Sequence, residues 1–108
     1  MEAEKDIENG CYNKAVSALY FSLRMVSEDL LLALHAPIPK RDDKLANSIG
    51  NIGFKEVSQA LRRLYDLRKK ADYSREKVTA REAIVALETY REARRRLEEG
   101  KPEACKGK

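Results

Sequence analysis

Apolar residues recur every three or four positions in three long stretches of the chain, and this spacing predicts three amphipathic α-helices. The stretches cover residues 12 to about 35, about 54 to 73, and 79 to about 97. Each should turn its apolar face inward. The expected inward-facing residues are Val16, Leu19, Tyr20, Leu23, Val26, Leu30 and Leu34, then Val57, Leu61, Leu64, Tyr65 and Ala71, and finally Ala83, Ile84, Leu87, Tyr90, Ala93 and Leu97.

Residues that start or stop helices lie at the boundaries of these stretches. Pro37 and Pro39 follow the first stretch and stop a helix there. Thr79 and Glu82 have the spacing of a capping box at the start of the third stretch. Gly100 follows its last turn, where a glycine commonly closes a helix.

Two shorter helices are expected at residues 3–9 and 42–49, with the glycines at 50 and 53 and the asparagine between them breaking the chain. Residues 1–100 then form one domain, and residues 101–108, which lack an apolar pattern, form a flexible C-terminal tail. The sequence therefore predicts an all-α fold, an antiparallel up-and-down bundle of four to five helices.

Composition excludes several classes of protein. Of the 108 residues 43% are apolar and 37% charged, as expected for helices with solvated outer faces. The longest apolar run is far shorter than the roughly 20 residues that span a bilayer, and the polar N-terminus is unlike a signal peptide. Cys11, Cys105 and the single histidine, His35, are scattered, so we expect no metal and no cofactor. A reduced, cytoplasmic protein fits best.

The net charge of +4 is unevenly distributed. Residues 55–81 hold nine basic and four acidic residues, with Tyr65 and Tyr73 among them. Such a segment could bind phosphates and stack bases, or it could be an ordinary solvated helix face.

Arg68 has an unusual position within this basic segment. At 100° per residue it lies about 20° from Leu61, on an otherwise apolar stripe. Asp72 follows one helical turn later and is the obvious ionic partner. The pair could brace the core, or it could line a polar groove.

Two segments together resemble the HEPN superfamily of small prokaryotic helical-bundle proteins. Residues 9–21 read NGCYNKAVSALYF, similar to the family's glycine and aromatic followed by Ala-Val-Ser and paired aromatics. Residues 67–73 read LRKKADY and precede Glu82-Ala83, which resembles a branch with an Arg-x-x-Ala-Asp-Tyr signature. The resemblance covers about residues 3–98.

The resemblance implies a bundle of four or five helices that dimerises. Many family members are toxins of toxin–antitoxin modules that cut RNA without a metal, and others accompany a minimal nucleotidyltransferase. The family's ribonuclease motif is an arginine followed four to six residues later by a histidine. Arg68 matches the arginine, whereas Tyr73 stands where the histidine would be. On this basis the candidate catalytic residues are Arg68 and Tyr73.

The leading hypothesis is an RNA- or nucleotide-binding protein of a two-gene module. The predicted ligand-binding residues are Arg68, Lys69, Asp72, Tyr73 and Tyr20. The alternative is a non-catalytic protein-interaction module with a structural Arg68–Asp72 pair.

A homodimer is expected because the apolar faces, notably Leu30 to Leu32, are wider than one small bundle covers. On a continuous helix Arg68 and Tyr73 are about 140° apart, so they converge only if the helix ends or distorts near Asp72 or a second copy supplies one of them.

Overall fold

The computed structural model describes residues 2–73 and 77–100, with Tyr73 described only through its backbone. Within this part of the chain all regular structure is helical, which confirms the all-α class. The five helices are α1 (Glu2–Glu8), α2 (Tyr12–Ala33), α3 (Asp42–Asn51), α4 (Lys55–Tyr73) and α5 (Ala80–Glu99). The tail predicted at residues 101–108 lies outside the described residues.

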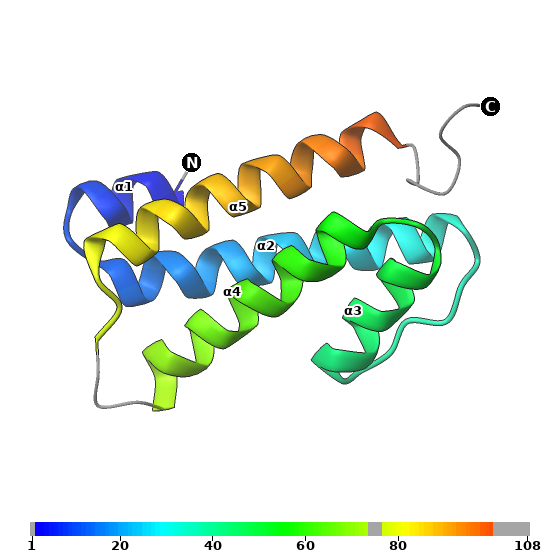
Figure 1. Cartoon of the computed structure of the whole chain (residues 1–108), viewed down its shortest axis with the longest axis horizontal. Helices are drawn as coiled ribbons and strands as arrows, with labels where there is room; N and C mark the ends of the chain where they lie inside the picture. Colours follow the sequence, from blue (N-terminus) through cyan, green and yellow to red (C-terminus); the bar gives the residue numbers. More distant parts are fainter. Residues whose placement is uncertain (1, 74–76, 101–108) are drawn as a thin grey trace.

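Helix α2 is the centre of the fold and packs against α1, α4 and α5 (Figure 1). Helix α4 also packs against α5, and α3 lies mainly on α4. The colours of Figure 1 show that α4 runs in the opposite sense to α2 and α5. No helix in the described residues is both long and apolar enough to cross a bilayer.

The core lies where α2, α4 and α5 meet, and most predicted inward positions are buried. Among the largest fully buried side chains are Leu19, Tyr20, Leu23, Leu31, Leu45, Ile49 and Leu64. Two predicted core residues are exposed instead, Leu34 by 53% and Ile84 by 48%. Leu34 lies beyond the last residue of α2 and so leaves the helical face. Ile84 is turned away because α5 packs through small residues, Ala83, Ala86 and Ala93, together with Tyr90.

The predicted start and end of α5 are both confirmed. The Thr79 side chain accepts from the Glu82 N–H, and the Glu82 carboxylate accepts from the Thr79 N–H, which completes the capping box. The pKa of Glu82 is lowered below its usual value, mainly by the hydrogen bond from the Thr79 N–H and next by the hydrogen bond from the Lys70 ammonium. Gly100 closes the helix with φ +65°, a conformation that favours glycine.

The predicted chain break at Gly50 and Asn51 is wrong, because both residues belong to α3. Packing, rather than a turn, favours the glycine here. A Cβ atom at Gly50 would come within 3.2 Å of Ser58 Oγ and 3.3 Å of Ser58 Cβ on α4. Ser58 is buried there and donates to the Ala46 carbonyl at 2.8 Å. The glycine thus lets α3 approach α4 closely.

Candidate functional site

The side chain of Arg68, on α4, lies against the paired aromatic residues Tyr20 and Phe21 of α2. Its guanidinium carbon is 4.8 Å from the Phe21 ring centroid and 5.7 Å from that of Tyr20. Its Nε lies 3.5 Å from an Asp72 oxygen, which makes an ion pair, but Nε is buried and donates no hydrogen bond among the described residues. The side chain stays 22% exposed. Arg68 is therefore held mainly by aromatic faces, with part of its cation open to solvent.

Tyr20 connects this part of α2 to the start of α3 through its hydroxyl group. Its side chain is buried, and its hydroxyl donates to the Asp42 carboxylate at the start of α3. Arg24 donates to the same carboxylate and also to the carbonyls of Pro39 and Lys40, at 3.3 and 3.1 Å. Burial first, and the hydrogen bond to Asp42 second, raise the pKa of Tyr20 well above its usual value. Its hydroxyl thus stays protonated and anchors the chain between α2 and α3.

Lys69 extends the cationic surface beside Arg68. Its ammonium lies 5.6 Å from the Tyr65 ring centroid, and the Tyr65 ring lies 5.7 Å from that of Tyr20. Arg68 and Lys69 therefore each lie over one end of a row of aromatic rings. We call Arg68 and Lys69, with the rings of Phe21, Tyr20 and Tyr65, the aromatic–cation cluster.

The structure brings four of the five predicted ligand-binding residues into this region. Arg68 and Asp72 form their predicted ion pair, Lys69 follows Arg68, and Tyr20 lies beneath. The side chain of Tyr73 lies outside the described residues. Tyr73 is the last helical residue of α4, so positions 68 and 73 lie on one continuous helix, about 140° apart around its axis.

Sequence reasoning missed two contacts that hold the end of α4 against the start of α5. The Asn13 side chain donates to the Ala71 carbonyl at 3.5 Å and accepts from the Val78 N–H at 3.0 Å. Lys70 donates to both carboxylate oxygens of Glu82 at 3.0 Å. The only signal for Asn13 was its place within the motif at residues 9–21. Both contacts fix the backbone on either side of the segment that follows Asp72.

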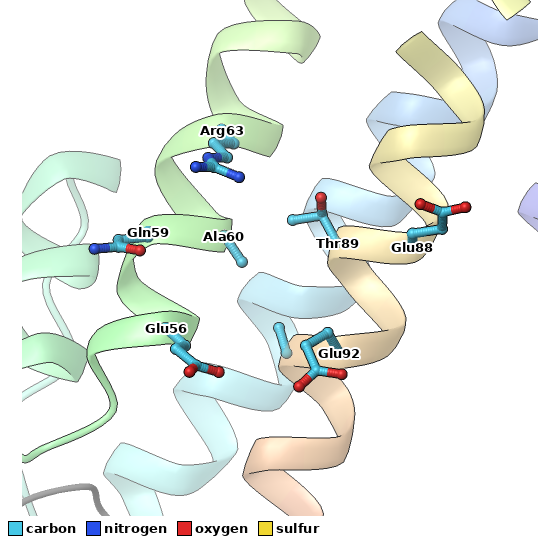
Figure 2. Close-up of a pocket in the computed structure, with 8 residues that line it drawn as sticks. Glu56, Gln59, Ala60, Arg63, Glu88, Thr89 and Glu92 are labelled. Atoms are coloured by element: carbon cyan, nitrogen blue, oxygen red, sulfur yellow. The ribbon is translucent and has the colours of Figure 1, made fainter. Parts of the chain in front are cut away.

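A separate hollow of about 310 Å³ lies between α4 and α5 (Figure 2). Small residues, Ala60 and Ala93, lie at its base. Its other lining residues are Glu56, Gln59, Arg63, Glu88, Thr89 and Glu92. Arg63 is about 140° around α4 from Arg68, so this hollow opens on a different face from the aromatic–cation cluster.

Two of the three acidic side chains in this hollow already form ion pairs with arginines of α5. Glu56 accepts from Arg96 at 2.8 and 3.0 Å. Glu92 is bound by Arg95, and that hydrogen bond lowers the pKa of Glu92 below its usual value. These pairs are typical of a solvated helix surface.

The remaining chemistry in the described residues is sparse. His35, the only histidine, is exposed just past the end of α2, about 21 Å along the helix from Phe21. The described residues contain no group of three or more acidic, histidine or cysteine side chains placed to hold a metal.

Comparison with protein-family models, with curated proteins and with solved structures finds no match. The aromatic–cation cluster combines exposed positive charge with aromatic surface, and it coincides with the residues that the sequence singled out.

Proposed function

We propose that this chain is a cytoplasmic HEPN-type protein of a two-gene, toxin–antitoxin-like module, with the antiparallel up-and-down bundle of that superfamily. It binds RNA or a nucleotide in a basic groove at a homodimer interface. Arg68 and Lys69 bind phosphate, Asp72 orients Arg68, and Tyr73 lies at the end of the same helix. Tyr20 supports the groove from below.

The position of Arg68 is the single observation that carries this proposal. A purely structural arginine would be buried with its carboxylate, whereas Arg68 is 22% exposed and lies 3.5 Å from Asp72. Stacking on Phe21 and Tyr20 restricts the side chain without using its outer N–H groups. An arginine fixed in this way engages phosphate through two parallel hydrogen bonds. Neighbouring aromatic rings and cations are the usual means of binding single-stranded nucleic acid.

Cleavage of RNA is the second activity that the resemblance implies, with Arg68 and Tyr73 as the catalytic pair. A tyrosine ordinarily titrates near pH 10, so it is a poor general base at neutral pH. We therefore expect metal-independent ribonuclease activity to be weak or absent. Binding is the activity that the contacts of Arg68 support.

The proposed partners are a second copy of the chain and a minimal nucleotidyltransferase. Support for the second protein comes from the resemblance alone. Purification of the protein from its native host should recover that partner, and repeated recovery of this chain without it would remove the partner from the proposal.

The alternative is a non-catalytic protein-interaction module. The observation that favours it is the exposure of large apolar side chains on α2, where Phe21 is 49% and Met25 63% exposed. In that case the Arg68–Asp72 pair only braces the end of α4.

The deciding experiment is a binding titration of the parent and Arg68→Ala with labelled single-stranded RNA and with a nucleotide. We expect Arg68→Ala to weaken binding at least tenfold, a change of about 1.4 kcal/mol. Its stability should fall by only about 1 kcal/mol, because the ion pair it removes is partly solvated. Arg68→Lys keeps the charge but loses the planar fork, so it should restore only part of the affinity.

Arg95→Ala is the matched control. Arg95 is 57% exposed on α5 and pairs with Glu92 and Glu99, away from the cluster. Its substitution removes the same charge, so general loss of positive charge affects both variants equally. The proposal fails if Arg68→Ala binds as well as Arg95→Ala does. A parent protein that binds neither ligand but forms a tight protein complex would support the interaction module instead.

A further inference from the structure

A second hollow, of about 280 Å³, lies between α3 and α4 and shares Tyr65 with the aromatic–cation cluster. Ala46 and Leu61 are buried in its lining, and the partly exposed ring of Tyr65 gives it an aromatic wall. The polar side chains that line it are Asp42, Asp43, Arg62 and Asp66. A concave surface with an apolar base, an aromatic wall and a few polar groups is the usual form of a small-molecule site.

Two carboxylates of this hollow have oxygens that are free to accept hydrogen bonds from a ligand. Oδ1 of Asp42 accepts from the Tyr20 hydroxyl and from Arg24, which fixes the orientation of the group. Its Oδ2 accepts from no residue that the structure describes, and the side chain is 28% exposed. Asp66 is exposed and, within the described part of the chain, makes no ion pair or hydrogen bond. Because an ionised carboxylate only accepts, both groups suit a ligand that presents N–H donors.

The charges around the hollow leave room for a ligand that carries a phosphate. Asp42 and Asp43 each pair with an arginine outside the lining of the hollow. Within the lining, Arg62 and Asp66 carry opposite charges. The three acidic side chains are therefore balanced by three cations, so they repel a nearby phosphate only weakly.

We propose that this hollow binds the base of a guanine nucleotide, stacked on the ring of Tyr65. Proteins read an unpaired base by stacking it on an aromatic side chain and by hydrogen bonds to its Watson–Crick edge. On that edge guanine presents two neighbouring donors, N1–H and the N2 amino group, to Asp42 and Asp66. Adenine presents one amino group beside an acceptor nitrogen, which the carboxylates would repel. The inference rests on the proposed function and adds recognition of the base to it.

Lys69 lies where the phosphate of such a nucleotide would reach it. It follows Tyr65 by one turn of α4, and its ammonium is 5.6 Å from the Tyr65 ring centroid. The hollow is slightly smaller than the roughly 300–1,000 Å³ of sites that enclose a whole drug-sized ligand, so it takes the base and leaves the ribose and phosphate outside. A base stacked on Tyr65 thus directs its phosphate towards Lys69 and the neighbouring Arg68.

The first test compares bases while the phosphate stays the same. Isothermal titration calorimetry of the parent protein with GMP, IMP and AMP separates the groups that the bases present. We expect GMP to bind at least tenfold more tightly than AMP. IMP, which lacks the N2 amino group, should lie between them. Equal affinities for the three nucleotides overturn the inference.

The second test changes one free carboxylate. Asp66→Asn keeps the size of the side chain but replaces an acceptor oxygen with a donor group. It should lower the affinity for GMP about tenfold and leave the affinity for AMP unchanged. Asp29→Asn, at an exposed position of α2, is the matched control, since it removes the same charge and should keep the preference for GMP. The inference fails if the ratio of GMP to AMP affinity is the same in the two variants.

Two further variants separate the stacking, the base contacts and the proposed function. Tyr65→Leu should weaken GMP and AMP by similar factors, because both bases stack, and parent-like binding by this variant overturns the inference. Arg68→Ala should weaken every nucleotide without changing the ratio of GMP to AMP affinity. Nucleotide binding with no preference among bases overturns the assignment of the hollow and leaves the proposed function intact. A parent protein that binds neither RNA nor any nucleotide overturns both.

Discussion

The hydrogen bond between Tyr20 and Asp42 allows a quantitative test of the network beneath Arg68. Tyr20→Phe removes only the hydroxyl and keeps the buried ring. A hydrogen bond to a charged group contributes about 1.5–3 kcal/mol. Asp42 is 28% exposed and keeps Arg24 as a partner, so the lower end applies, and we expect a loss of about 1.5 kcal/mol at pH 7. The melting temperature should fall by about 6–12 °C.

The pH dependence of this loss is the sharper part of the prediction. The folded protein raises the pKa of Tyr20 above its ordinary value of 10.0, so the folded state holds the phenolic proton more tightly than the unfolded chain does. The stability that this proton contributes is complete below pH 10 and declines as the pH rises further, by about 1.4 kcal/mol at pH 11. Tyr20→Phe has no such proton. The free energies of unfolding of the two proteins should therefore converge near pH 11.

Urea unfolding followed by circular dichroism at pH 7, 9, 10 and 11 measures both quantities. Titration of the other tyrosines and lysines affects parent and variant alike and cancels in their difference. Tyr90→Phe is the control. Tyr90 is also buried, but its hydroxyl accepts only a long hydrogen bond, of 3.4 Å, from Arg94. It should cost less than about 0.5 kcal/mol. A difference between parent and Tyr20→Phe that stays constant from pH 7 to 11 would refute the account of the Tyr20 hydroxyl.

Two further predictions concern the junction between α4 and α5. Thr79→Ala removes the side-chain half of the capping box and should lower the free energy of unfolding by about 1 kcal/mol, measured as a shift in the urea midpoint at an unchanged slope. Asn13→Ala leaves the Val78 N–H and the Ala71 carbonyl without their partner. It should cost about 1 kcal/mol and speed amide exchange at Val78 more than at Leu64 in the middle of α4; equal acceleration at both amides would show global destabilisation instead.

Local sequence signals were sufficient to predict the helices. The capping box at Thr79, the prolines after residue 36 and the glycine at position 100 act on their own neighbours, and each marks an observed helix boundary. At Gly50 a local signal predicts the wrong structure. A glycine followed by an asparagine is a turn signal locally, but here the close contact with Ser58 on another helix favours a glycine inside α3. Nothing within a few residues of Gly50 indicates that contact.

The candidate site was predictable only in part for the same reason. The Arg68–Asp72 pair spans one helical turn, so the sequence predicted it. The position of Phe21 against Arg68 depends on how α2 and α4 pack, and these residues are 47 apart in the chain. The Tyr20–Asp42 contact depends on the path of the connection between α2 and α3. Side chains that meet across two elements cannot be paired from periodicity alone.

The two interpretations of Arg68 left open by the sequence, core brace or groove, predict different environments for its charge. A brace requires a desolvated pair, whose disruption costs about 3–5 kcal/mol. Here the side chains of Arg68 and Asp72 are 22% and 38% exposed, so the pair is only partly desolvated although Nε itself is buried. The aromatic rings of α2 restrain the arginine instead, and they leave its charge available at the protein surface. This is the arrangement expected of a residue that binds an anion.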